Sequence, residues 1–343
     1  MSAQTTVGLT YDLKDDYRDS GLDPEIIAEF DSPETVDGIE SALRYLGCRV
    51  VRIGHIQNLV QRLAAGERWD LVFNICEGLH GIAREAQVPA LLEAYGIPCT
   101  FSDAAGMALM LDKGLTKLVL QNHGIPTAPF AVVRTTEDVA AVKLPFPLFA
   151  KPLAEGTGKG INAFSYIDTP DHLERACDHL LQKFQQPVLV ETYLGGREFT
   201  VGMLGTGNRT RIIGIMEIAI HENGCANHYG YNNKTAWFDH IQYKLVQRHE
   251  ETSLYKAIEN MAIKTWQALD CRDAGRLDIR CDCAGNPFIL EINPLAGLCP
   301  GFSDLVVLAG KAGMPYNALI RNIVAETAHR YNLKLPDQCY EAA

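Results

Sequence analysis

Residues 274–294 read AGRLDIRCDCAGNPFILEINP, and this stretch decides the fold. Apolar residues flank a Gly-Asn-Pro turn sequence, which predicts two antiparallel strands over 276–283 and 288–293. If Gly285-Asn286 forms a two-residue turn, Asp278 lies opposite Asn293 and Arg280 lies opposite Glu291. Because side chains alternate faces along a strand, one face carries Asp278, Glu291 and Asn293, and the other carries Leu277, Ile279, Leu290 and Ile292.

The polar face of this hairpin has the composition of a magnesium site. Two carboxylates and an amide oxygen are hard-oxygen ligands, which suit Mg²⁺ better than zinc, and the set contains no histidine or cysteine. The alternative is a solvated polar face with ordinary cross-strand pairs, although the apolar opposite face argues against it. Both interpretations stay open on these residues alone.

A glycine-rich loop lies in the middle of the chain, at Glu155-Gly156-Thr157-Gly158-Lys159-Gly160. Its glycines allow backbone N–H groups to approach an anion closely. It is not a P-loop, because position 153 is Leu and Gly160 follows Lys159. It is not the dinucleotide fingerprint either, because it lies far from the first strand and does not open a helix. The loop is therefore either a nucleotide-phosphate flap of another kind or a plain hairpin turn between strands at 146–151 and 161–166.

Three well-separated lysines are candidate phosphate ligands: Lys113, Lys151 and Lys234. Lys151 is the least ordinary, because it follows the apolar run Pro147-Leu148-Phe149-Ala150. A partly buried lysine needs an anion as partner, and a phosphate would serve. The alternative for each lysine is an ordinary surface side chain.

Composition narrows the class of protein. The 343 residues carry a formal charge of −11, with 47% hydrophobic residues, so the chain lacks the basic face that nucleic-acid or anionic-membrane binding needs. It has no apolar run long enough to span a membrane and no secretory signal at Met1-Ser2-Ala3-Gln4. The ten cysteines lie mostly in apolar surroundings and form no CxxC. We expect a cytoplasmic protein of two or three domains, with reduced thiols, acting on small molecules.

Strand and helix signals alternate in the first hundred residues, which predicts a small parallel α/β unit. Strands are expected at 6–10, 48–53 and 71–75, and helices over 33–46, starting at Ser32-Pro33-Glu34, and over 85–95. A helix over 107–122 and a proline cluster mark the change to an α+β unit, with a further helix at 168–182 and a strand at 188–191. The last part is expected to have strands at 199–204 and 212–220, a long loop at 221–245 and a helix at 254–269.

Together these motifs resemble the ATP-grasp superfamily and, within it, the D-alanine–D-alanine ligases. The resemblance runs from about Asp70 to Arg330, and its motifs keep the order and spacing of the family. They are Leu92-Glu93 through Pro98, Leu111-Asp112-Lys113, Ala150-Lys151-Pro152 with Glu155-Gly156, Glu198-Phe199-Thr200-Val201, Gly275-Arg276-Leu277-Asp278 and Glu291-Ile292-Asn293-Pro294.

The resemblance implies a three-domain ATP-grasp fold, in which a parallel α/β domain precedes two α+β domains that clasp ATP. The expected ranges are 1–106, 107–195 with the glycine loop, 196–335 with the magnesium site, and a tail at 336–343. The family also implies a homodimer formed through the N-terminal domain.

The same resemblance assigns roles to single residues. Lys113 and Lys151 would hold the α- and β-phosphates of ATP, Lys234 would touch the γ-phosphate, and Arg276 would stabilise developing charge. The phosphate flap would comprise Glu155, Gly156, Thr157, Gly158, Lys159 and Gly160. The hinge facing adenine would comprise Glu191, Tyr193 and Leu194, and Glu198 would bond the ribose. Asp278, Glu291 and Asn293 would bind two Mg²⁺ ions, for which Mn²⁺ can substitute.

The implied activity is an ADP-forming carboxylate–amine ligase that works through an acyl phosphate and needs no side-chain nucleophile. The family's acidic N-terminal motif, which grips the first D-alanine, is matched only approximately here, with Glu29 near the expected place. Ser303 would stand in for the serine that binds the second substrate's carboxylate, after a segment one residue longer than the family's. Three alternatives therefore stay open: a true D-alanine–D-alanine ligase, a mycosporine-type imine-forming ligase, and a nucleotide-binding protein without activity.

Overall fold

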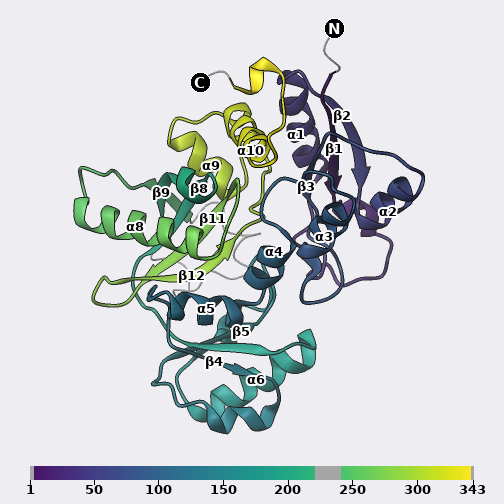
Figure 1. The fold of residues 1–343 in the computed structure, drawn as a ribbon. Coiled ribbons are helices and arrows are strands. Elements are labelled where there is room, and N and C mark those ends of the chain that lie inside the picture. Colours follow the sequence, from purple (N-terminus) through teal and green to yellow (C-terminus); the bar gives the residue numbers. More distant parts are fainter. Residues whose placement is uncertain (1–3, 221–240, 341–343) are drawn as a thin grey trace.

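The structure is a computed structural model that describes residues 4–220 and 241–340. The described chain forms three sheets, each with its own helices (Figure 1). No helix in these two ranges is long and apolar enough to cross a membrane. The division into domains at 106, 195 and 335 stays a prediction.

The first sheet is parallel, as expected. Its strands are β1 (Thr6–Tyr11), β2 (Arg49–Gly54) and β3 (Leu71–Ile75), in the order β2-β1-β3. Helix α1 (Pro33–Tyr45) begins at the predicted Pro33, and α2 (Ile56–Ala64) and α3 (Gln87–Ala94) complete the unit. Because β1 and β3 are parallel neighbours, they end at the same edge of the sheet, where open parallel sheets place their ligands.

The second sheet has the order β4-β7-β5-β6 and is antiparallel. Its strands are β4 (Phe130–Val133), β5 (Leu148–Pro152), β6 (Tyr166–Ile167) and β7 (Val188–Thr192), and α6 (Pro170–Phe184) covers one face with Leu173, Cys177 and Leu180. The strand expected at 161–166 is wrong for most of its length. Asn162 caps a short 3₁₀ helix at Ala163–Ser165 instead, so only two residues pair with β5.

The third sheet is the largest, with the order β10-β9-β8-β11-β12. Its strands are β8 (Glu198–Leu204), β9 (Arg211–Ile220), β10 (Ile241–Leu245), β11 (Ala274–Cys281) and β12 (Pro287–Asn293). Helix α8 (Thr252–Ala268) packs on it through the fully buried Trp266, whose indole N–H donates to the carbonyl of Gly205 at 2.9 Å. The loop expected over 221–245 is wrong at its end, because 241–245 pairs with β9; residues 221–240 lie outside the described residues.

The predicted register of the β11–β12 hairpin is wrong, by three residues next to the turn and by two residues from Asp278 onward. Asp278 pairs with Glu291, and Arg276 pairs with Asn293. The reason is the turn: Asp282 accepts hydrogen bonds from the backbone N–H groups of Ala284 and Asn286, which makes a five-residue loop, and a bulge follows Asp278. A shift of two residues keeps each side chain on its face. The expected grouping of Asp278, Glu291 and Asn293 on one face therefore survives the error.

The helix expected over 107–122 is two helices, α4 (Ala104–Leu111) and α5 (Lys113–Asn122). Asp112 lies between them in an extended conformation and accepts a hydrogen bond from the N–H of Leu115 at 2.9 Å. Because of this break, Lys113 is the first residue of α5, and its side chain extends from the N-terminal end of that helix.

One hydrophobic core joins the two ends of the chain. Val7, Leu43 and Phe73 from the first unit share it with Leu319 and Ile323 from α10 (Tyr316–Tyr331). The C-terminal helix α10 therefore packs against α1 of the N-terminal unit.

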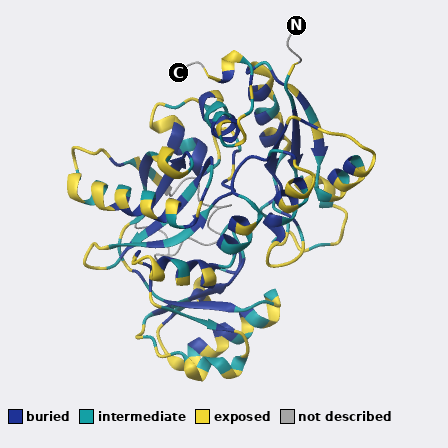
Figure 2. Ribbon diagram, in the orientation of Figure 1, coloured by how far each residue is buried: buried dark blue, intermediate teal, exposed yellow. Residues whose placement is uncertain are grey.

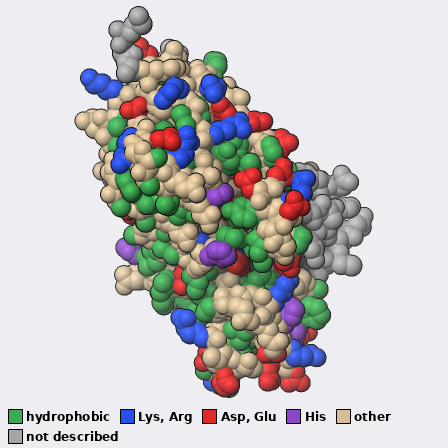
Figure 3. Space-filling model, turned by 90° about the vertical axis from the view of Figure 1, so that its right-hand side faces the viewer, with side chains coloured by type: hydrophobic (Ala, Val, Ile, Leu, Met, Phe, Trp, Pro, Cys, Tyr) green, Lys and Arg blue, Asp and Glu red, His purple; other side chains and the backbone are tan. Residues whose placement is uncertain are grey.

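Figure 2 shows the buried strands inside and the exposed outer faces of α6 and α8. The face drawn in Figure 3 intersperses Lys and Arg with Asp and Glu.

Candidate active site

One cavity between the second and third sheets collects most of the predicted residues. Its apolar end is formed by Phe149, Tyr193 and Leu194, and its charged end by Arg276 and Asp278. The predicted residues in its wall are Lys151, Thr157, Gly158, Glu191, Tyr193, Leu194, Glu198, Arg276, Asp278, Glu291 and Asn293. An aromatic end and an ionic end in one cavity match a ligand with a flat ring and a polyanionic tail.

The apolar end is built from rings. Tyr193 stacks with Phe149 at 6.4 Å between centroids and meets Tyr166 edge-on at 5.0 Å. The guanidinium of Arg280 lies 5.2 Å from the centre of the Tyr193 ring and 3.4 Å from the carboxylate of Glu198. Glu198 therefore lies at the edge of the ring site, where the resemblance places a ribose.

A buried charge network forms the floor of the cavity. Glu191, only 3% exposed, receives Lys151 on one carboxylate oxygen and Lys117 on the other, both at 2.8 Å. Burial opposes ionisation of Glu191, but the two facing ammonium groups outweigh it and lower the pKa of this carboxyl to about 2. Burial also opposes the charge on Lys151, yet Glu191 and Glu291 raise the pKa of that ammonium. Lys151 is therefore held in its charged form in the cavity wall. The Glu191 carboxylate pairs with Lys117 and Lys151, whereas the resemblance assigns Glu191 to the hinge that faces adenine.

Lys113 lies at the start of α5 and points to the metal-ligand candidates. Its ammonium contacts Glu291 at 2.9 Å and donates to the backbone carbonyl of Glu155 at 2.5 Å. Burial raises the pKa of Glu291, but Lys113 and Lys151 outweigh it and lower that pKa overall. A charged lysine and an ionised carboxylate therefore face each other at the mouth of the glycine loop.

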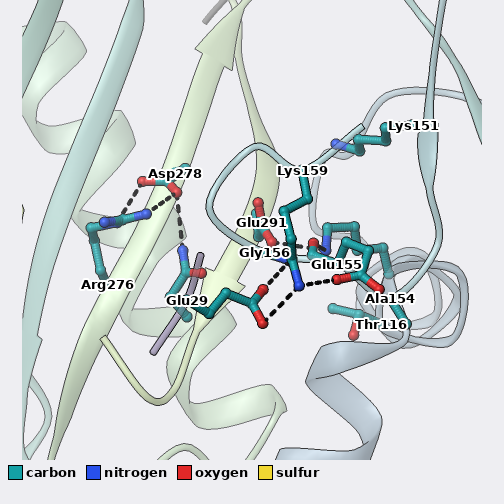
Figure 4. Close-up of polar contacts among 12 residues, drawn as sticks. Glu29, Thr116, Lys151, Ala154, Glu155, Gly156, Lys159, Arg276, Asp278 and Glu291 are labelled. Atoms are coloured by element: carbon teal, nitrogen blue, oxygen red, sulfur yellow. Dashed lines mark hydrogen bonds and ion pairs between the residues drawn. The ribbon is translucent and has the colours of Figure 1, made fainter. Parts of the chain in front are cut away.

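The predicted magnesium ligands lie together on β11 and β12 (Figure 4). Asp278 accepts from Thr200 at 3.0 Å, from Arg276 at 2.9 and 3.0 Å, and from the side-chain amide of Asn293 at 3.0 Å. Because Asn293 donates through its nitrogen, its amide oxygen is the atom offered to a cation. The donor set is two carboxylates and one amide oxygen.

This donor set fits Mg²⁺ rather than a metal held by protein alone. In the two described ranges no three His, Cys, Asp or Glu side chains are grouped as a metal cluster. Mg²⁺ is commonly bound by one or two carboxylates together with substrate phosphates and water, so a phosphate would complete the site. Asp278, Glu291 and Asn293 are thus suited to hold a metal that arrives with a nucleotide.

The glycine loop has two sides. Thr157 and Gly158 face the cavity, and both have left-handed φ, at 53° and 71°. Gly156 donates its N–H to Glu29 at 2.6 Å, and Gly160 donates to Glu25 at 3.1 Å. The N-terminal segment therefore holds the loop from behind while its tip covers the cavity.

The resemblance places Lys159 in the phosphate flap, and an ordinary lysine would be exposed to solvent. The structure shows neither environment for this side chain. It is 5% exposed, and its ammonium contacts Glu29 at 3.0 Å and also pairs with Glu155 (Figure 4). Arg84 joins the same cluster through Glu29 at 3.0 Å. In this arrangement Lys159 fastens the loop to the N-terminal unit and does not reach the cavity.

Two further predicted residues remain, Ser303 and Lys234. Ser303 is not in the cavity wall, and its hydroxyl instead accepts the N–H of Cys299 at 3.0 Å. Lys234 lies outside the described residues. The cavity wall contains Asp304 in place of Ser303.

Sequence reasoning missed several residues at or around the site, among them Lys117, Arg84 and Asp304. Lys117 lies four residues after Lys113, on the same helix face, and that spacing was a usable signal. Asp304 directly follows Ser303 in the sequence, so the residue found in the wall is one position from the predicted one. Arg84 gave no local signal, because its partners Glu29 and Glu155 lie 55 and 71 residues away.

Acidic side chains lie close to the ends of β1 and β3, where Asp12 and Glu77 follow the strands. Glu85 is 9% exposed, and burial together with Glu29 raises the pKa of its carboxyl to about 7. Burial and the neighbouring Glu85 raise the pKa of Glu77 as well. Burial likewise raises the pKa of Asp12, which accepts the N–H of Gly78 at 2.9 Å. Protonated carboxyls are therefore favoured where β1 and β3 end.

Comparison with known proteins agrees with this geometry. Residues 119–325, more than half of the chain, match the family described as the D-ala D-ala ligase C-terminus. Proteins called D-alanine–D-alanine ligase from Bordetella avium and Bordetella petrii are 30% and 32% identical, over 85% and 79% of this chain and 88% and 79% of theirs. An uncharacterized protein of Sinorhizobium fredii is 32% identical over 76% of this chain and 75% of its own.

Solved structures give the same fold. The D-alanine–D-alanine ligase of Bacillus anthracis complexed with ATP has a TM-score of 0.73 at 20% identity, covering 96% of this chain and 99% of that one. The VanG D-Ala:D-Ser ligase of Enterococcus faecalis has a TM-score of 0.71 at 16% identity, covering 94% and 99%. The chain belongs to the D-alanine–D-alanine ligase-like family of the ATP-grasp fold, and it is an ATP-dependent carbon–nitrogen ligase.

Proposed function

We propose that the protein activates a substrate carboxylate with ATP and joins it to an amine, releasing ADP and phosphate. The substrates would be amino acids, or an amino acid and a small metabolite. The observation that carries the proposal is that Lys151, Asp278 and Glu291 line one cavity whose other end is aromatic. Lys113 contacts this wall through Glu291 at 2.9 Å. We also propose a cytoplasmic homodimer, on the family resemblance.

In the first step an oxygen of the substrate carboxylate attacks the γ-phosphorus of ATP, and the bond to the β-phosphate oxygen breaks. The acyl phosphate forms and ADP leaves. Lys113 and Lys151 would hold the phosphates, and the tip of the loop at Thr157-Gly158 would exclude water. Positioning and charge stabilisation carry most of such a transfer.

In the second step the amine nitrogen attacks the acyl carbon, the carbon–oxygen bond to phosphate breaks, and the amine gives up a proton. Arg276 would stabilise the charge that develops on the acyl phosphate. Asp278, Glu291 and Asn293 would hold magnesium, which neutralises phosphate charge when bound. No side-chain nucleophile is required, so the charged end of the cavity needs only to position and to stabilise.

The test is ADP release by the purified protein with Mg-ATP, one substrate set at a time. The sets are D-alanine, a panel of amino acids singly and in pairs, and mycosporine-glycine with amino acids. We expect release that depends on both a carboxylate and an amine, with the product identified by mass spectrometry. Robust formation of D-alanyl-D-alanine would identify an ordinary member of the family. ATP binding without release in any set would contradict the proposal.

A further inference from the structure

Asp304 is a buried carboxylate in the wall of the same cavity as the magnesium-ligand candidates. It is the first residue of α9 (Asp304–Lys311), and it is 9% exposed. The cavity wall at this end contains Arg276, Asp278, Asn293 and Asp304. Asp304 therefore lies at the ionic end of the cavity, where a second substrate must approach the transferred phosphate.

The Asp304 carboxylate is fixed in position by two hydrogen bonds. One oxygen faces Arg276 at 2.9 Å, and the other accepts from the hydroxyl of Tyr243 at 2.8 Å. The remaining nitrogens of Arg276 are bonded to Asp278. One guanidinium thus serves two carboxylates, of which Asp278 is a proposed magnesium ligand and Asp304 is not. Before a metal binds, these three side chains together carry a net negative charge.

This charge selects the sign of the group that can bind beside it. A carboxylate brought next to Asp304 would be a second anion in a poorly hydrated site, and like charges at close range are strongly unfavourable there. The N-terminus of α9 would otherwise attract an anion, but a carboxylate of the chain itself already lies there. An ammonium or neutral amine faces no such repulsion and can donate to Asp304.

We infer that Asp304 selects an amine acceptor that carries no carboxylate beside its nitrogen, such as an amino-acid amide or a simple amine. The inference rests on the proposed function, because it assigns the acceptor of that reaction. Asp304 is then a specificity-determining residue, and Ser303 has no part in holding the acceptor.

The test compares D-alaninamide with D-alanine, two probes that differ only at the carboxyl group. Binding is measured by titration calorimetry in the presence of Mg²⁺ and the non-hydrolysable analogue AMP-PNP, so it does not depend on turnover. The variants are Asp304→Asn, which removes the charge at constant shape, and Asp304→Ser, which also suits the start of a helix. Asp337→Asn, an exposed acid outside the cavity, is the matched control.

We expect D-alaninamide to bind the wild type and to lose at least tenfold in affinity in both Asp304 variants. D-alanine affinity is expected to stay unchanged or to rise in Asp304→Ser. AMP-PNP affinity and melting temperature should match the wild type, which separates lost recognition from lost folding. No binding of D-alaninamide to the wild type, or equal changes for both probes, would overturn the inference.

Different results would contradict the proposed ligase activity and the role assigned to Asp304. If binding changes as expected but no substrate set releases ADP, the proposed ligase activity fails and the assignment of Asp304 stands. If ADP is released with D-alanine as acceptor and Asp304→Asn does not change the preference for D-alaninamide, the activity stands and the assignment fails.

Discussion

Glu29 accepts a hydrogen bond from the backbone N–H of Gly156 at 2.6 Å, across 127 residues of chain. The same carboxylate pairs with Lys159 and Arg84, and these charges lower its pKa against the opposing effect of burial. An ionised side chain of the N-terminal unit thus determines where the glycine loop lies. The loop that covers the cavity is positioned by a unit that contributes none of the candidate magnesium ligands.

Gly156→Ala should release this loop. A Cβ at this position would lie 2.6 Å from the Glu29 carboxylate, which is closer than real Cβ contacts, so Glu29 must move and the pairing with Lys159 weakens. We expect ATP-dependent turnover to fall about tenfold or more and limited proteolysis within 153–165 to speed up. Gly310→Ala is the control, because its Cβ meets nothing within 4 Å. Equal activity of the two variants would contradict this role of Glu29.

Glu191→Gln should destabilise the protein strongly. The change leaves Lys117 and Lys151 buried beside each other without their counter-charge, and breaking such a pair typically costs about 3–5 kcal/mol. Urea unfolding measures the loss in the free energy of unfolding. The control is Glu250→Gln, from an exposed pair with Lys244 at 4.0 Å, for which less than about 1 kcal/mol is expected. A loss below that size at Glu191 would show that the network is hydrated.

The local patterns were sufficient to predict most elements, and the family resemblance pointed to most of the predicted residues in the cavity wall. The apolar alternation around Asp278 and Glu291 was enough to place both carboxylates on one face, even with the register wrong. The helix start at Ser32-Pro33 and the helix expected at 168–182 agree with the structure to within a few residues.

What the sequence could not predict depends on contacts between distant segments. The hairpin is an exception, because its turn is local. The same residues are compatible with a two-residue turn and with the five-residue loop made by Asp282, so the register could not be predicted. The partners of Lys159 and Arg84 come from segments more than fifty residues away, so no spacing rule reaches them. Asp304 was missed because the family resemblance pointed to Ser303, the residue before it.

The stability of the protein should depend on pH through Glu85. The native state raises the pKa of this carboxyl from its usual 4.5 to about 7, so the folded protein binds this proton more tightly than the unfolded chain. Protonation of Glu85 therefore stabilises the folded protein fully below about pH 4.5, and this stabilisation is lost as the pH rises through about 7. Asp31, whose pKa burial also raises to about 7, acts in the same direction.

Glu85→Gln removes the Glu85 contribution. Relative to the wild type, the variant should be more stable at pH 8 than at pH 5, by about 2–3 kcal/mol at most. Urea unfolding of both proteins at the two pH values gives the difference directly. A difference that does not change with pH would mean that Glu85 is ionised throughout.

Glu291→Gln should separate catalysis from folding. The amide keeps the size of the side chain and a donor-acceptor contact with Lys113, but it weakens the cation site formed with Asp278 and Asn293. We expect ADP release to fall about a hundredfold or more, with a melting temperature within a few degrees of the wild type. Raising the Mg²⁺ concentration should recover part of the activity if the lost charge acts through the metal, and EDTA should abolish turnover of the wild type until Mg²⁺ or Mn²⁺ is restored. A large fall in melting temperature without nucleotide would instead assign Glu291 to the fold, because its main task would then be to neutralise the buried Lys113.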